Sequence, residues 1–305
     1  MTTAPNLKGI GFLLLAMLIG SLQAVAVKWI GGNYSVLEIV TIRSLVALPI
    51  TILFFRLEGG NGLPTTNHRT TQYVRGFFLF LSYTTYMMGL AALPLADVES
   101  LRFSGPLMIT ILSVFMLGEK VELPRWLALL VGFAGILLII QPGSTHFNEG
   151  SLFVLISVLF YALTVIFTRK LKAADSSATM AYFSVWVYLI SAFIFSPLAA
   201  AVGEIPNAHP SVVFLFHAWT VPTLLDFSIM AGLGLIWSLW AYFMTRAYSI
   251  AQASVIAPFE YVSLPVSIMW GFLFWREIPT ALTIAGAALT LASGMFILYL
   301  DRKTS

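Results

Sequence analysis

The sequence predicts an all-α integral membrane protein whose ten transmembrane helices form two inverted repeats of five. Three observations predict this fold. Apolar residues make up 59% of the 305 residues and charged residues only 10%, and the mean hydropathy is +0.92, far from the composition of a soluble globular chain. The apolar residues fall into runs long enough to cross a bilayer. The two halves of the chain also resemble each other.

Each predicted span is a run of about 20 mostly apolar residues, the length that an α-helix needs to cross the hydrocarbon core. Glycine, proline and asparagine punctuate the connections, as expected where helices must stop. The first run continues to Ile30, which is too long for the apolar core of a signal peptide. The ten spans cover residues 9–30, 35–56, 72–93, 95–117, 122–141, 150–171, 178–202, 222–245, 252–275 and 279–300.

An internal duplication is clearest in the fourth and ninth spans. Residues 96–119 align without gaps with residues 254–277 at a shift of 158, which places Arg102 opposite Glu260. Two such segments in one chain are typical of membrane proteins built from repeats.

The duplication also includes the first span of each half. Residues 9–30 align with residues 150–171 at a shift of 141. We therefore expect a first repeat at residues 9–141 and a second at residues 149–300. The growth of the shift from 141 to 158 is most simply placed in the connection 203–221, because loops tolerate insertions.

Basic residues indicate the orientation of the spans. Five spans per repeat is an odd number, so the two repeats enter the membrane from opposite sides. Lys28 and Arg276 lie on one predicted side, and Arg43 and Arg102 lie within spans. The positive-inside rule then places both termini in the cytoplasm. The twelve basic residues on the cytoplasmic side are Lys8, Arg56, Arg69, Arg75, Lys120, Arg125, Arg169, Lys170, Lys172, Arg246, Arg302 and Lys303.

The sequence contains no enzyme signature that we recognise. It has neither the glycine-rich phosphate loop of ATP-driven pumps nor the His-Glu-x-x-His helix of zinc enzymes, and it has no cysteine. We expect no cofactor, no metal and no nucleic-acid partner. The histidines lie in or beside connections, where we expect solvated loop residues: His68, His146, His209 and His217.

Several charged residues fall within the predicted spans, where each costs about 2.5–3.5 kcal/mol on insertion scales and needs a partner or water. Glu99 and Arg102 are three residues apart and share a helix face. Two interpretations are open. Either these charges bind a substrate or a coupling proton, or Arg43 and Arg102 are neutralised by Glu99 and Glu260 in a structural network. Glu38 and Asp97 lie near span ends, from which they can reach the interface.

Aromatic side chains with a polar tip lie deep in three spans. Tyr83 and Tyr86 lie in the third, Trp237 and Trp240 in the eighth, and Tyr261 in the ninth. A buried tyrosine or tryptophan usually needs a hydrogen-bond partner. These rings line a pocket or belong to the ordinary core of the bundle.

Prolines and small residues mark two further features. The fourth span is interrupted at Gly105-Pro106, and the ninth at Pro258 and Pro265. Broken membrane helices are typical of binding sites, although proline is also common in membrane helices.

Small residues in spans 5 and 10 have the spacing of closely packed helix pairs, within one protomer or in a weak dimer. They are Ala128, Gly132, Gly135, Gly286, Thr290 and Gly294.

Motifs in both halves resemble those of the EamA family of the Drug/Metabolite Transporter superfamily. In the first half they are the residues from Ala96 to Leu101, Pro106, Leu117-Gly118-Glu119, Arg125-Trp126, Gly132 to Gly135 and Gln141-Pro142-Gly143. In the second half they are Ala257 to Tyr261, Trp275 to Pro279 and Gly286-Ala287. The second half has Arg276-Glu277 where Gly-Glu is commoner, a departure without a clear meaning for the substrate.

The resemblance implies a ten-helix carrier of the bacterial inner membrane that moves a small organic metabolite by alternating access around a central cavity. We expect an amino-acid-like or planar aromatic substrate and either passive exchange or coupling to a proton. The protein is expected to be a monomer or a weak homodimer. The candidate substrate-binding residues are Arg43, Tyr83, Tyr86, Glu99, Arg102, Trp237, Trp240, Glu260 and Tyr261. The alternatives are a non-transporting membrane receptor or assembly subunit and an intramembrane enzyme, for which no nucleophile with a base is evident.

Overall fold

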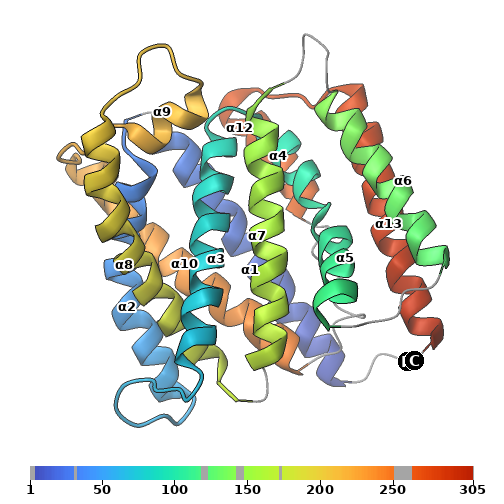
Figure 1. The fold of residues 1–305 in the computed structure, drawn as a ribbon, viewed down its shortest axis with the longest axis horizontal. Coiled ribbons are helices and arrows are strands. Elements are labelled where there is room, and N and C mark those ends of the chain that lie inside the picture. Colours follow the sequence, from blue (N-terminus) through green and yellow to red (C-terminus); the bar gives the residue numbers. More distant parts are fainter. Residues whose placement is uncertain are drawn as a thin grey trace.

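The computed structural model describes residues 4–30, 33–117, 123–141, 148–171, 174–250 and 263–304. Within these ranges every regular element is an α-helix, and the long helices run side by side in a bundle (Figure 1). The helices are α1 (Ala4–Ile30), α2 (Val36–Leu57), α3 (Arg69–Leu90), α4 (Leu95–Arg102), α5 (Gly105–Leu117), α6 (Leu123–Ile140), α7 (Gly150–Leu171), α8 (Ser177–Val202), α9 (Pro210–Phe216), α10 (Leu224–Ile250), α12 (Ser263–Trp275) and α13 (Ala281–Thr304).

The helices follow the predicted spans closely, with three differences. The fourth predicted span is divided into α4 and α5 by a turn at Phe103 and Ser104, next to the predicted break at Gly105. The ninth is described only from Ser263, as α12, so the predicted break at Pro258 lies outside the described residues. The short helix α9 lies in the connection where the sequence places the extra length of the second half.

Six helical segments are long and apolar enough to cross a membrane, namely residues 8–30, 36–57, 95–116, 150–168, 177–202 and 224–244. Three more helices contain shorter apolar stretches, at residues 126–140, 266–275 and 281–293. These segments make the chain a multi-pass membrane protein in composition and length.

Helix α3 coincides with a predicted span but is not among these apolar segments. Its first turns contain the polar residues Gln72 and Arg75, and both side chains are buried. They are buried because α3 contacts α2, α7 and α8. A helix whose polar side chains face other helices rather than lipid does not need a uniformly apolar sequence, which is why hydropathy alone understates α3.

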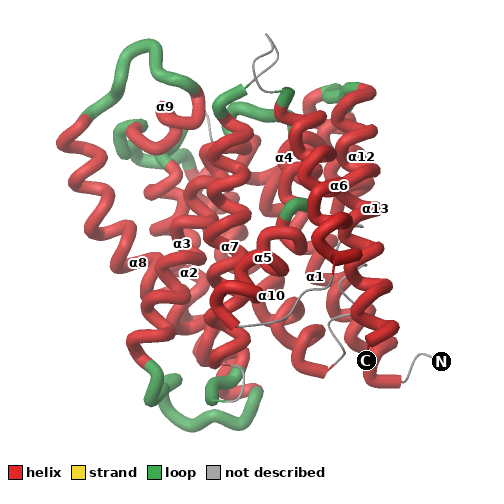
Figure 2. The backbone as a smooth tube through the Cα atoms, turned by 45° about the vertical axis from the view of Figure 1, so that its right-hand side comes forward, coloured by secondary structure: helices red, strands yellow, loops and turns green. Residues whose placement is uncertain are grey.

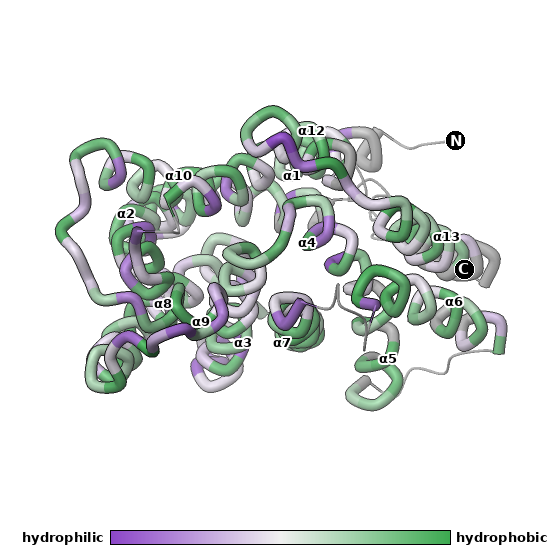
Figure 3. Tube along the Cα trace, turned by 90° about the horizontal axis from the view of Figure 1, so that it is seen from above, coloured by the Kyte–Doolittle hydropathy of each residue, from purple (hydrophilic) through white to green (hydrophobic). Residues whose placement is uncertain are grey.

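Helices α6 and α13 pack closely along one edge of the bundle (Figure 3). At Gly135 a methyl group would lie only 2.6 Å from the carbonyl oxygen of Gly286 and 2.6 Å from Thr290 Oγ1. The hydroxyl of Ser293 donates a hydrogen bond to the carbonyl oxygen of Ala128. The small residues predicted to mediate close packing therefore do so within one chain, as small residues commonly do between membrane helices.

The connection from α8 through α9 to α10 covers one end of α2. Ser35 Oγ donates a hydrogen bond to the carbonyl oxygen of Leu215 at 3.2 Å, and the backbone N–H of Thr220 donates to Glu38 Oε2 at 3.4 Å. Tyr34 donates to Asp226 Oδ2 at 2.7 Å. Glu38 is consequently only 1% exposed, because this connection covers it, and whether it lies at the membrane interface stays a prediction.

Different connections lie at the two ends of the bundle. The α9 connection lies at one end, and the connection between α2 and α3 lies at the other (Figure 2). The last described turn of α13 lies toward the α2–α3 end (Figure 2).

The contact between α6 and α13 is testable with two matched glycine substitutions. Gly135→Ala should lower the melting temperature of the detergent-purified protein, because overpacking typically costs about 1–3 kcal/mol. Gly232→Ala is the control, since no atom lies within 4 Å of a methyl group at Gly232 in α10 and alanine is the better helix former. Equal melting temperatures for the two variants would contradict the close approach of α6 and α13.

Candidate functional site

Arg43 lies at the meeting point of four helices. Its side chain comes from α2 and the residue is 1% exposed. The guanidinium carbon Cζ lies 3.9 Å from the ring centroid of Tyr83 on α3, 4.7 Å from that of Tyr188 on α8, and 5.4 Å from that of Trp237 on α10. We call these three rings the aromatic cage. They also contact one another edge to face, Tyr188 lying with its centroid 5.9 Å from those of both Tyr83 and Trp237.

The polar atoms inside the aromatic cage are incompletely satisfied. Among the residues that the structure describes, Arg43 Nε and Nη1 and the hydroxyl of Tyr83 are buried without a hydrogen-bond partner. Each cation–π contact contributes about 0.5–2 kcal/mol, whereas burying a charge costs several kcal/mol. Unpaired buried donors are rare in native proteins and are often found at functional sites. The aromatic cage is therefore a candidate functional site, because it contains a buried charge whose donors are incompletely satisfied.

A second cluster surrounds Arg102, where α4 ends. Arg102 Nη1 donates to Glu99 Oε1 at 2.8 Å, and its guanidinium carbon lies 4.8 Å from the ring centroid of Tyr86. The hydroxyl of Tyr86 donates to the same carboxylate oxygen at 3.4 Å. The side chain of Arg102 is 40% exposed and that of Glu99 is 7% exposed. The predicted pair between Glu99 and Arg102 is confirmed.

Helix α3 connects the two clusters. Tyr83 belongs to the aromatic cage and Tyr86 to the Arg102 cluster, and residues three apart lie on the same face of a helix. The Cα atoms of Tyr83 and Tyr86 are thus separated by about 4.5 Å along the helix axis. The structure brings six of the predicted site residues onto or around this one face: Arg43, Tyr83, Tyr86, Glu99, Arg102 and Trp237.

The other predicted site residues lie elsewhere or are not described. Trp240 packs against Gly20 of α1, where a methyl group would lie 2.7 Å from Trp240 Cδ1. The structure therefore places Trp240 in the contact between α1 and α10 rather than in the aromatic cage. Glu260 and Tyr261 lie outside the described residues. The candidate network linking Glu260 to the arginines stays a prediction.

The sequence reasoning missed Tyr188. This residue is 1% exposed and its hydroxyl donates to the carbonyl oxygen of Leu79 at 3.0 Å. Its position in the middle of α8 meets the criterion that singled out Tyr83 and Trp237, a polar-tipped ring far from the interface. Applied to every span, that criterion would have found Tyr188.

Arg75 provides a contrast to Arg43. It is also buried, at 6% exposure, but its guanidinium is engaged by protein groups. It donates to Ser184 Oγ at 2.7 Å, to Gln72 Oε1 at 3.3 Å and to Thr168 Oγ1 at 3.4 Å, and also to the carbonyl oxygen of Met180. These partners lie on α3, α7 and α8. Arg75 therefore joins three helices and is a structural residue.

An ion pair lies between α1, α12 and the start of α4. Lys28 at the end of α1 pairs with Glu277, just after α12. Lys28 also donates to the carbonyl oxygen of Leu93 at 3.1 Å, and the backbone N–H of Leu95 donates to Glu277 Oε2 at 3.1 Å. The pair thus joins α1, α12 and the start of α4. Asp97 nearby accepts a hydrogen bond from Thr283 Oγ1 at 2.7 Å.

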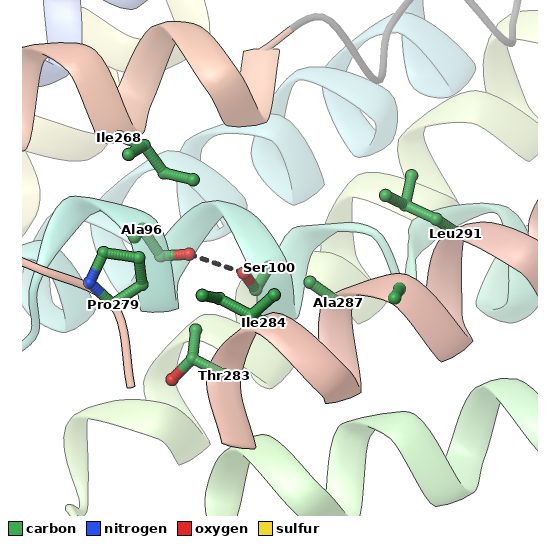
Figure 4. A pocket seen from close by; sticks show the side chains of 9 residues that line it. Ala96, Ser100, Ile268, Pro279, Thr283, Ile284, Ala287 and Leu291 are labelled. Carbon is green, nitrogen blue, oxygen red and sulfur yellow. Dashed lines mark hydrogen bonds between the residues drawn. The ribbon is translucent and has the colours of Figure 1, made fainter. Parts of the chain in front are cut away.

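An apolar groove of about 170 Å³ lies between α4, α12 and α13 (Figure 4). Its two hydroxyl groups are already engaged, Ser100 with the carbonyl oxygen of Ala96 at 2.7 Å and Thr283 with Asp97. Neither arginine cluster lines it. The groove offers apolar surface without a free polar group, so we do not assign substrate recognition to it.

Comparison with known proteins adds the following. Residues 7–141 match the model of the EamA-like transporter family. The S-adenosylmethionine uptake transporter of Rickettsia bellii is 27% identical over 97% of this chain and 94% of that protein. The pseudopaline exporter CntI of Pseudomonas aeruginosa is 27% identical over 93% of this chain and 94% of that protein. A riboflavin transporter of Rhizobium johnstonii is 29% identical over 72% of this chain and 66% of that protein.

One solved crystal structure superposes with a TM-score of 0.64 and covers 98% of this chain and 99% of its own. Its sequence is 16% identical. The two chains therefore share a fold.

The contrast between the two buried arginines is testable by removing each charge. Arg75→Met should strongly lower the melting temperature, because it removes the hydrogen bonds that Arg75 donates to Ser184, Gln72, Thr168 and the Met180 carbonyl, and a hydrogen bond from a charged group contributes about 1.5–3 kcal/mol. Arg43→Met should leave the melting temperature unchanged or raise it, since it removes a buried charge that has no hydrogen-bonded counter-ion among the described residues. A larger fall for Arg43→Met than for Arg75→Met would make Arg43 the structural residue of the two.

Proposed function

We propose that the chain is a secondary transporter of a small organic metabolite and a member of the EamA-like transporter family, whose model matches residues 7–141. Relatives named for S-adenosylmethionine, riboflavin and pseudopaline support a substrate that is amino-acid-like or contains a planar heteroaromatic ring. The transporter works by alternating access and is not an enzyme. Its substrate site is a central one, formed by both arginine clusters along the Tyr83–Tyr86 face of α3.

The observation that carries this proposal is the aromatic cage, in which Arg43 is buried between helices of both halves. The aromatic cage combines Arg43 and Tyr83 from the first half with Tyr188 and Trp237 from the second. Movement of the halves against each other would therefore rearrange the cage directly. A site at the interface between repeats is the arrangement found in many secondary transporters.

The arrangement of the helices supports two inverted repeats, at residues 9–141 and 149–300. Helix α1 contacts α10 and α12, and helix α7, its counterpart in the second repeat, contacts α3 and α5. Helices α10 and α3 are counterparts, as are α12 and α5. Each contact in one set thus has an equivalent in the other, as a twofold relation between the repeats requires.

The break between α4 and α5 supplies a hinge next to the Arg102 cluster. The turn at Phe103 and Ser104 interrupts the helix one residue after Arg102, and such interruptions are tolerated in membrane helices where protein or water satisfies the backbone. In our proposal α4 tilts relative to α5 as the site opens. Glu99 is the candidate for a coupling proton, because protonation would release Arg102 from the ion pair.

We place the protein in a bacterial inner membrane with both termini in the cytoplasm, as the distribution of lysine and arginine indicates. The absence of cysteine makes this topology simple to test. Glu204→Cys, before α9, should react with a membrane-impermeant maleimide in intact cells. Glu58→Cys, after α2, should react only after the cells are permeabilised. The reverse labelling pattern would show that the orientation is opposite, and labelling of both sites in intact cells would contradict their placement on opposite sides.

The transport function is tested with purified protein in proteoliposomes. Radiolabelled S-adenosylmethionine, riboflavin and a panel of amino acids are offered, and we expect protein-dependent uptake or exchange of at least one. Arg102→Ala should reduce that flux by about tenfold or more, because a hydrogen bond to a charged group contributes about 1.5–3 kcal/mol. Arg69→Ala is the matched control, since Arg69 is exposed at the start of α3. Wild-type flux equal to that of empty liposomes for the whole panel would overturn the proposal.

A further inference from the structure

We propose that Arg43 and the hydroxyl of Tyr83 form a subsite for a carboxylate of the transported molecule. This inference rests on the proposed transport function and names the chemical class of the substrate. It follows from three features of the aromatic cage: the burial of an uncompensated positive charge, the unpaired hydrogen-bond donors around it, and the engagement elsewhere of the carboxylates that could have neutralised it.

The first feature is the burial of the charge. Arg43 is 1% exposed and is among the largest fully buried side chains of the protein. Arginine retains its positive charge in proteins, so this group cannot avoid the cost of burial by losing a proton. The ring faces compensate part of that cost by cation–π attraction. An anion placed against the guanidinium would compensate far more, since two opposite charges attract strongly where water is excluded.

The second feature is the set of free donors. Arg43 Nε and Nη1 have no hydrogen-bond partner among the described residues, and the Tyr83 hydroxyl is buried and unpaired as well. Tyr83 lies directly against the guanidinium, at 3.9 Å from centroid to Cζ. A carboxylate accepts several hydrogen bonds through two oxygens, and the planar guanidinium matches its geometry. One ligand carboxylate would therefore satisfy donors from both side chains.

The third feature is that the protein offers Arg43 no carboxylate of its own among the residues described. Six of the buried or half-buried acidic side chains are engaged elsewhere, and Glu58, whose Oε2 is buried without a partner, lies fifteen residues further along the chain than Arg43, after the end of α2. Glu38 accepts from Thr220, Asp97 from Thr283, Glu99 from Arg102, Asp175 from Gln72, Asp226 from Tyr34 and Glu277 from Lys28. Glu260, the partner that the sequence suggests, lies outside the described residues, and in our proposal a substrate carboxylate supplies the negative charge.

The neighbouring cluster fits the rest of such a molecule. From Tyr83 the same face of α3 continues to Tyr86, and from there to Glu99. A ligand with its carboxylate at Arg43 would lie along two phenol rings and reach a carboxylate of the protein with its other end. The subsite thus favours small zwitterions or acids with an apolar or cationic remainder, and it disfavours neutral compounds without an acidic group.

The test compares acids with counterparts that lack the carboxylate. Binding to the full-length protein in detergent is measured by thermal shift and titration calorimetry for S-adenosylmethionine and its decarboxylated counterpart, and for a set of amino acids with their primary amides. We expect at least one acid to bind about tenfold or more tightly than its counterpart, a factor that corresponds to about 1.4 kcal/mol. In Arg43→Met this ratio should fall to about one, and in Arg69→Ala it should stay at the wild-type value.

Tyr83→Phe provides a second variant that removes one oxygen and nothing else. We expect it to weaken binding of the acid severalfold while leaving binding of the amide unchanged. The variant therefore tests the subsite even if Arg43→Met does not fold. A wild-type ratio that survives in Tyr83→Phe would remove the hydroxyl from the subsite as proposed.

The outcomes separate this inference from the transport function. Equal binding of acids and amides by a protein that transports any member of the panel would refute the carboxylate subsite and leave the transporter standing. A preference for acids that persists in Arg43→Met would place carboxylate recognition elsewhere and refute the role of Arg43. Neither binding nor flux with any compound would count against both proposals.

Discussion

The contact between the Arg43 guanidinium and the three rings of the aromatic cage lies where the four helices α2, α3, α8 and α10 meet. Lipid offers no partner to a cation, so the side chain must be enclosed by protein. Close packing makes the enclosure possible. At Gly234 of α10 a methyl group would lie 2.5 Å from the carbonyl oxygen of Arg43, so α10 can approach α2 closely only because this residue has no side chain.

The other basic residues of the helix bundle show what a purely structural charge looks like. Arg75 binds protein groups on three helices, and Lys28 binds a carboxylate and a carbonyl. In both arrangements the folded protein itself supplies acceptors for the donors of Arg75 and Lys28. Arg43 departs from this pattern, and departures from local satisfaction at an otherwise well-packed position are expected where a protein has a task besides folding. Comparison of Arg43 with Arg75 and Lys28 therefore distinguishes a buried charge with unpaired donors from charges whose donors are paired within the protein.

Much of the fold could be predicted from the sequence, because hydropathy and turn residues act locally. The span limits and the interruption before Gly105 are of this kind. The direction in which each side chain points could not be predicted in this way, since it depends on which helices become neighbours. Tyr188 joins Arg43 and Trp240 turns toward α1, although both lie as deep as Trp237. The burial of Glu38 depends on a connection more than 180 residues away in sequence, which no local pattern records.

The α9 connection has a consequence for the energetics of the proposed cycle. If the two repeats were perfectly equivalent, a twofold rotation would convert the inward-facing state into the outward-facing state. The two states would then have equal populations. The α9 connection belongs to the second half alone and contacts Ser35 and Glu38 at one end of the bundle. In the proposed cycle, contacts that form in one state alone would favour that state, and a difference of about 1.4 kcal/mol changes the ratio of the two states tenfold. Mutation of this surface loop could retune the resting orientation of the carrier while leaving its affinity for substrate intact.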